Sequence, residues 1–175
     1  AAMRAIAPEV RFLLVGSGAE RDPIARQAQR EGVLGDSLWI WPPMAKQEMP
    51  AVLAAATVAT SVFVPLEPMW NNSANKFFDA LAAGRPVAIN YGGWQADLLR
   101  EAGAGIVLPP DDATRAAHAL AMFDRHAPVL AAHHASHVAR IPPRDVLQGR
   151  DTFNQVVVVG GDQRRAQVGQ QLDHR

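Results

Sequence analysis

The most constraining feature of the sequence is a regular alternation between short apolar runs and longer segments with helical spacing, punctuated by glycine and proline. Apolar runs typical of buried strands occupy residues 10–15, 38–41, 58–64, 86–90 and 105–108. Amphipathic segments with helix start and stop signals occupy residues 22–31, 47–55, 74–83, 94–102, 112–124 and 128–139. This alternation across short loops predicts an α/β fold with a parallel sheet and helices on both faces.

Parallel sheets of this kind bind ligands outside the carboxyl ends of their strands. Four loops should meet at that edge, namely residues 16–18, 41–44, 65–73 and 90–93. A binding site is therefore expected among them.

The composition argues against several other functions. Basic and acidic residues both number 17, whereas domains that bind nucleic acid usually carry a basic excess, so no nucleic-acid partner is expected. The absence of cysteine excludes disulfides, thiolate metal sites and a cysteine nucleophile, and it fits a cytoplasmic protein. The longest apolar stretch, residues 51–66, is too short and too interrupted to span a bilayer.

Residues 73–86 carry the clearest chemical signal. Ser73 or Asn72 is a good helix cap, which places Lys76, one of two lysines in the chain, in the first turn. A cation in the first turn interacts unfavourably with the helix dipole unless an anion binds beside it. Free backbone N–H groups and a lysine at a helix amino end together form a phosphate-binding site. Asp79, one turn further on, is suited to accept hydrogen bonds from a diol such as ribose. The apolar residues at helical spacing predict the buried stripe of this helix: Ala74, Phe77, Phe78, Leu81 and Ala82.

A simpler interpretation of this helix is an ion pair between Lys76 and Asp79 on a solvated face. The position of the helix favours the phosphate site, because it follows a buried strand and a polar loop at the ligand-binding edge.

Four segments, in the right order along the chain, resemble motifs of the large family of retaining glycosyltransferases with the GT-B fold. They are residues 14–20, 47–56, 79–87 and 104–112. The third, Asp79-Ala80-Leu81-Ala82-Ala83-Gly84-Arg85-Pro86-Val87, is similar to the family's E-A-x-A-x-G-x-P-V run. The Ser-x-Asn-Lys-Phe-Phe-Asp form of residues 73–79 resembles a subgroup that transfers N-acetylated amino sugars in surface-polysaccharide and lipopolysaccharide assembly.

The resemblance implies that the chain is the Rossmann-like, C-terminal half of a GT-B fold and binds a nucleoside-diphosphate sugar linked to UDP. A saccharide or lipid-linked acceptor would bind through an N-terminal domain, with peripheral association at the inner membrane, and no metal or other cofactor would be required. Asn71 and Lys76 are implied to be catalytic. The residues implied to bind the donor are Gly16, Trp41, Pro42, Pro43, Asn72, Ser73, Ala74, Asn75, Lys76 and Asp79.

Two residues depart from the family pattern. The second glutamate of the family is Asp79 here, and the first falls on Asn71, which carries no negative charge. Two alternatives therefore stay open: a UDP-sugar epimerase domain, and a non-catalytic domain that binds nucleotide sugars.

The expected donor-binding domain covers residues 1–153 and lacks its first strand, while residues 154–175 form a tail that the pattern does not place. The chain alone is expected to bind donor weakly and turn over nothing. Gly16-Ser17-Gly18 is not a dinucleotide fingerprint, because Arg21 stands where the third glycine should be. His133, His134 and His137 are interpreted as a solvated helix face rather than a metal site.

Overall fold

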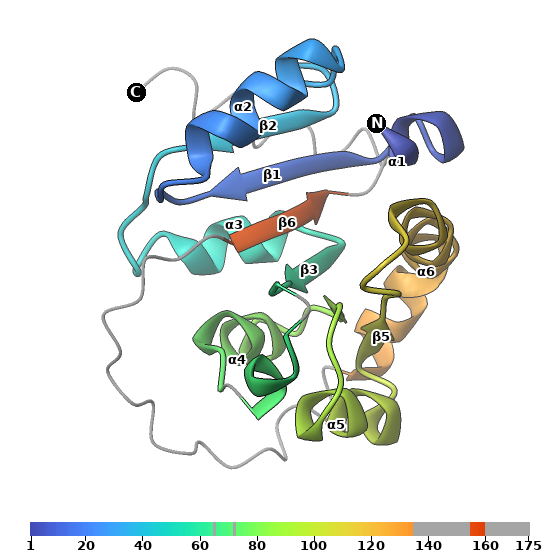
Figure 1. Ribbon diagram of the computed structural model, residues 1–175. Coiled ribbons are helices and arrows are strands. Elements are labelled where there is room, and N and C mark those ends of the chain that lie inside the picture. The colour runs from blue at the N-terminus through green and yellow to red at the C-terminus, as the bar shows by residue number, and fades with distance from the viewer. Residues whose placement is uncertain (65, 72, 135–154, 160–175) are drawn as a thin grey trace.

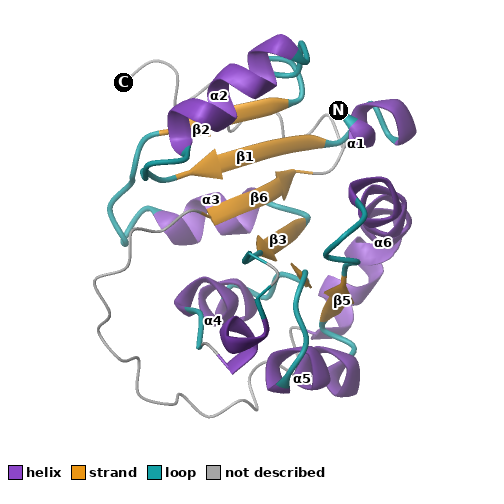
Figure 2. Ribbon diagram, viewed as in Figure 1, coloured by secondary structure: helices purple, strands orange, loops and turns teal. Residues whose placement is uncertain are grey.

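A six-stranded sheet forms the centre of the protein (Figures 1 and 2). The computed structural model describes residues 1–64, 66–71, 73–134 and 155–159. Across the sheet the strand order is β2-β1-β6-β3-β4-β5. The strands are β1 (Arg11–Val15), β2 (Leu38–Trp41), β3 (Val58–Ser61), β4 (Val87–Ile89), β5 (Gly105–Val107) and β6 (Gln155–Val159).

Five strands run parallel, as expected, and the sixth does not. β1 pairs with β2, β3 with β4, and β4 with β5, all in parallel. β6 lies antiparallel between β1 and β3, and Val157 stands opposite Leu13 on one side and Ala59 on the other. Because β6 opposes both neighbours, β1 and β3 point the same way, and the carboxyl ends of β1 to β5 share one edge of the sheet.

The predicted α/β class is therefore confirmed, and a central antiparallel strand was not predicted. The run of four valines in β6 has high strand propensity, and a central strand satisfies backbone groups of both neighbours. Residues 154 and 160–175 of the predicted tail lie outside the described residues.

Most predicted helices are present with small shifts at their ends. The helices are α1 (Ala2–Ile6), α2 (Arg21–Arg30), α3 (Met49–Ala55), α4 (Asn75–Ala82), α5 (Trp94–Ala102), α6 (Ala113–His134) and the 3-10 helix η1 (Glu67–Asn71). The prediction of two helices, 112–124 and 128–139, is wrong, because α6 runs without interruption through Pro128. A proline removes one helical hydrogen bond, and here that loss does not end the helix.

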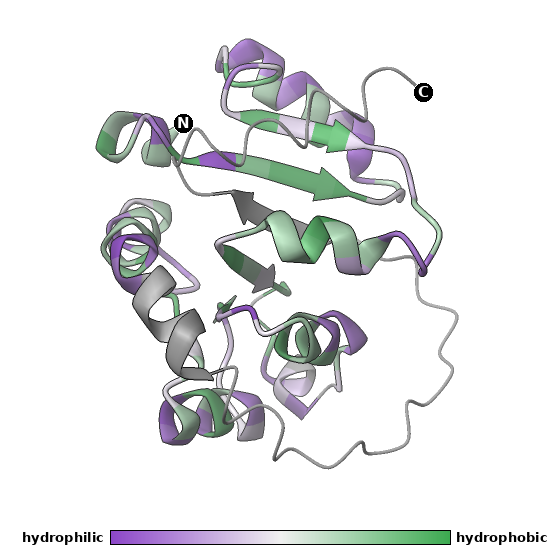
Figure 3. Cartoon of the chain, turned by 180° about the vertical axis from the view of Figure 1, so that it is seen from behind, coloured by the Kyte–Doolittle hydropathy of each residue, from purple (hydrophilic) through white to green (hydrophobic). Residues whose placement is uncertain are grey.

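Alternate strand residues face two hydrophobic cores. On one face Val87 and Ile89 pack with α3, α4 and α5, whose largest fully buried side chain is Phe77. On the other face Val58 and Ala88 pack with α1 and α6. α3 lies behind the sheet in Figure 1 and in front of it in Figure 3, where β1 is strongly hydrophobic and α2 mostly hydrophilic.

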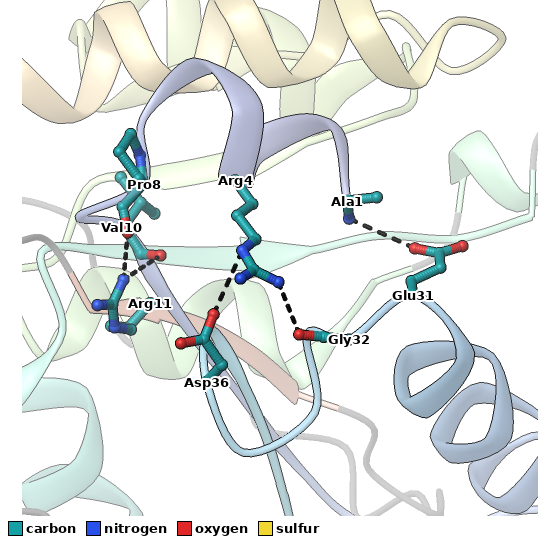
Figure 4. A network of polar contacts seen from close by, with 8 residues as sticks. All are labelled: Ala1, Arg4, Pro8, Val10, Arg11, Glu31, Gly32 and Asp36. Atoms are coloured by element: carbon teal, nitrogen blue, oxygen red, sulfur yellow. Dashed lines mark hydrogen bonds and ion pairs between the residues drawn. The ribbon is translucent and has the colours of Figure 1, made fainter.

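A network of polar contacts holds α1 against the turn between α2 and β2 (Figure 4). Arg4 donates to the carbonyl of Gly32 at 2.7 Å and pairs with Asp36 at 3.4 Å. The terminal amine of Ala1 lies 3.5 Å from Glu31. Exposed ion pairs of this kind add little stability. Within the described residues, no helix is long and apolar enough to cross a membrane.

Candidate functional site

The carboxyl edge of the sheet gathers most of the predicted site residues. Gly16 follows β1, and Trp41 ends β2. The N–H of Gly16 donates to the carbonyl of Trp41 at 3.2 Å, so the two predicted loops are joined. Pro42 and Pro43 follow and are exposed. The loop after β3 leads through η1 into α4, and the amino end of α4 therefore lies at the same edge.

The start of α4 differs from the prediction. The N-cap residue is Ala74, with φ −74° and ψ 118°, and no side chain caps this helix in the described part of the chain. The expectation that Ser73 or Asn72 would cap it is therefore wrong. Ala74 is buried in the core beside Phe77, which places the first helical residue at Asn75. Ser73 is exposed, and Asn72 lies outside the described residues.

Lys76 turns back from the first turn of α4 toward the loop after β3. Its Nζ donates to the carbonyl of Val62 at 3.1 Å and lies 4.6 Å from the centre of the Phe63 ring. The side chain is half-buried, and burial lowers the pKa of Lys76 to about 8. A cation in this position is held by a neutral carbonyl and an aromatic face, and it has lost part of its hydration.

Asp79 is half-buried on the next turn, and burial raises the pKa of its carboxyl group while nearby Lys46 opposes that rise. The loop after β2, which carries Lys46, thus lies close enough to influence α4. Among the described residues no ion pair joins Lys76 to Asp79. The interpretation of the two as a solvated ion pair is therefore wrong, because Lys76 reaches to Val62 instead.

Asn90, directly after β4, secures the loop on which Lys76 rests. The N–H of Phe63 donates to Asn90 Oδ1 at 2.9 Å, and Asn90 Nδ2 donates to the carbonyl of Phe63 at 2.8 Å. Sequence reasoning placed residues 90–93 at the ligand edge but did not identify Asn90. The available signal was an asparagine at the carboxyl end of a buried strand.

A buried chain of hydrogen bonds lies beside this loop. The Tyr91 hydroxyl is 3.0 Å from Ser61 Oγ and donates to Gln95 Oε1 at 2.7 Å. Because that amide oxygen only accepts, the Ser61 hydroxyl must donate to Tyr91. The Tyr91 ring also contacts the Phe63 ring, with centroids 5.0 Å apart. The chain ties the ends of β3 and β4 to the first turn of α5.

The 3-10 helix η1 packs on the turn before α5. A Cβ atom added to Gly93, which has φ +82°, would lie 2.8 Å from the carbonyl oxygen of Trp70, so only glycine permits this approach. One added to Gly92 would lie 3.3 Å from the Trp70 ring. Asn71 follows Trp70 and is exposed at the end of η1, and Asn75 is half-buried in the first turn of α4.

Metal binding finds no support in the part of the chain that the structure describes, where no three His, Asp or Glu residues gather as ligands. His133 and His134 belong to α6, and His137 lies outside the described residues.

Comparison with known proteins identifies the family. The family described as Glycosyl transferases group 1 matches residues 1–123 of the chain. That range covers β1 to β5 and every described residue of the site. No curated protein matches the sequence. Because the match spans well over half of the 175 residues, the chain belongs to the group 1 glycosyltransferases.

Proposed function

We propose that the chain is the donor-binding domain of a retaining glycosyltransferase, and that the diphosphate of a UDP-linked sugar binds at the amino end of α4. The observation that carries the proposal is Lys76, a partly desolvated cation in the first turn of a helix that no described side chain caps. Backbone N–H groups, the helix dipole and a cation together favour a phosphate group.

We assign roles to four of the other predicted residues and to Asp79 from their positions relative to this centre. Asp79, one turn along α4, would accept hydrogen bonds from the ribose hydroxyl groups. Trp41 ends β2 at the same edge, Pro42 and Pro43 follow it, and these residues would contact the base. Asn71, between Trp70 and the start of α4, would contact the transferred sugar. Neither a metal nor another cofactor enters the proposal.

Sugar transfer needs stabilisation of the negative charge that grows on the departing UDP. Preorganised N–H dipoles and a cation facing that charge are the usual means. Lys76 is fixed before the ligand arrives, because Val62 and Phe63 hold its ammonium group. The cost of orienting this side chain is therefore paid during folding rather than during binding.

Titration calorimetry with UDP on the full 175-residue chain tests the proposal. Lys76→Met keeps most of the apolar stem and removes the charge, so UDP affinity should fall by about 1–3 kcal/mol, roughly 5- to 150-fold. Arg30→Met is the matched control, because it removes one exposed charge from the last turn of α2, at the opposite edge of the sheet. Equal affinities of wild type and Lys76→Met would refute the phosphate site.

Thermal-shift measurements against UDP-, GDP- and ADP-linked sugars would test the choice of nucleotide. Sugar transfer to a saccharide or lipid-linked acceptor, measured on a protein that includes an acceptor-binding domain, would test the reaction. Epimerised product without any acceptor would favour the epimerase alternative, and binding without either product would favour a non-catalytic domain.

A further inference from the structure

The peptide unit between Val62 and Phe63 is held from both sides by side chains that come from different elements. Its N–H belongs to Phe63 and donates to Asn90 Oδ1 at 2.9 Å. Its C=O belongs to Val62 and accepts from Lys76 Nζ at 3.1 Å. In a trans peptide the N–H and the C=O lie in one plane and point in opposite directions. Asn90 therefore hydrogen-bonds to one side of this rigid peptide plane, and Lys76 hydrogen-bonds to the opposite side.

We infer that Asn90 is a positioning residue of the donor site, which orients the Val62–Phe63 peptide and through it places the Lys76 ammonium group for an anionic ligand. The inference rests on the proposed function of Lys76. Asn90 itself is assigned no contact with the ligand.

The chemistry of Asn90 suits this role. An amide side chain both accepts and donates, and Asn90 uses both functions on one residue, at 2.9 Å to the Phe63 N–H and 2.8 Å to the Phe63 carbonyl. The parallel register of β3 and β4 ends at Ser61 opposite Ile89, so Asn90 continues the pairing by side chain where the backbone ladder stops. Alanine would lose both bonds.

The same two bonds also place the Phe63 ring. Lys76 Nζ lies 4.6 Å from its centre, and the Tyr91 ring supports it from another side at 5.0 Å. Asn90 fixes both the N–H and the C=O of Phe63. The Val62 carbonyl and the Phe63 ring therefore keep their positions relative to the Lys76 ammonium group. Hydrogen bonds in series also polarise one another, so the Asn90 bond strengthens Val62 as an acceptor for Lys76.

A double-mutant cycle with UDP as the probe separates positioning from general support of the fold. Asn90→Ala should lower UDP affinity about 3- to 10-fold. In the Lys76→Met background the same change should alter the affinity by less than about twofold, because no ammonium group remains to be placed. An equal loss in both backgrounds would overturn the inference.

Leu120→Ala is the matched control. It removes a buried side chain of α6 from the core on the other face of the sheet, and so weakens the fold away from the loop on which Lys76 rests. It should leave UDP affinity unchanged within about twofold. If it costs as much affinity as Asn90→Ala at the same loss of melting temperature, Asn90 acts through stability and the inference is wrong.

A measurement without ligand keeps the inference testable if the proposed function fails. The chain has two lysines, Lys46 and Lys76, so NMR of protein labelled with ¹³C-lysine gives two signals, and Lys46→Arg assigns them. In Asn90→Ala the titration midpoint of Lys76 should rise by roughly half a pH unit or more, as the loosened loop readmits water. An unchanged midpoint would overturn the inference, whether or not UDP binds. If Asn90→Ala does not fold, Asn90→Ser, which is too short to make both bonds, serves in its place.

Discussion

Binding of UDP should draw a proton onto Lys76 from solution when the pH is near 8 or above. In the free protein, burial lowers the pKa of Lys76 to about 8, so the side chain is about half charged at pH 8. A bound diphosphate favours the charged form and should return the pKa toward the ordinary lysine value of about 10.4. Binding of UDP should therefore be accompanied by an uptake of protons from solution by Lys76.

The size of the response follows from these two pKa values. At pH 8 the uptake should be about half a proton per UDP bound, and at pH 9 about 0.9, because the free form is then mostly neutral. UDP affinity should accordingly fall about tenfold between pH 7 and pH 9, equivalent to about 1.4 kcal/mol. UDP contributes little in this range, because its terminal phosphate loses its last proton near pH 6. The pKa of Tyr91, raised by burial to about 12, lies above the range.

Calorimetry in two buffers of different ionisation enthalpy measures the uptake directly, since the observed heat differs by the number of protons taken from the buffer. Lys76→Met is the control and should show neither the uptake nor the tenfold fall. Zero uptake in the wild type at pH 8.5, or an equal uptake in Lys76→Met, would refute the reasoning that the bound diphosphate recharges Lys76.

Three further predictions concern the fold and can be tested by urea denaturation. Phe77→Ala, at a position with no exposed surface, should lower the free energy of unfolding by about 3–5 kcal/mol, and a loss below about 1 kcal/mol would contradict the packing of α4. Gly105→Ala would place a Cβ atom 2.0 Å from the Val87 carbonyl oxygen, so β5 must move away from β4 at a cost of about 1–3 kcal/mol or more; unchanged stability would contradict the register of β5. Lys76 loses its proton near pH 8 in the folded chain but keeps it up to about pH 10.5 in the unfolded chain. The free energy of unfolding of the wild type should therefore rise between about pH 8 and pH 10.5, relative to that of Lys76→Met. Partial exposure of Lys76 limits that rise to about 1–2 kcal/mol, and parallel curves would show that its pKa is not lowered in the folded state.

Local patterns were sufficient to predict most of the elements. Residues 38–41 and 94–102 were predicted with the bounds that the structure has for β2 and α5, because prolines or glycines mark their ends. Alternation of elements predicted the α/β class and the edge at which the loops meet. Lys76 in the first turn of a helix at that edge was also legible from the sequence, because helix periodicity and strand order are short-range properties.

Tertiary structure decided what local patterns do not encode. Residues 154–175 were not placed from the sequence, because the antiparallel position of β6 between β1 and β3 depends on which backbone groups lack partners once the chain has folded. The N-cap of α4 is Ala74 rather than the predicted Ser73 or Asn72, because Ala74 is buried in the core. Lys76 donates to the Val62 carbonyl, 14 positions away, and Asn90 hydrogen-bonds to Phe63, 27 positions away. The sequence by itself thus determined most of the elements, their order and the chemical groups at the ligand edge. Only packing of the strands and helices determined which of those groups touch, because contacts across so many residues follow from the arrangement of the whole sheet.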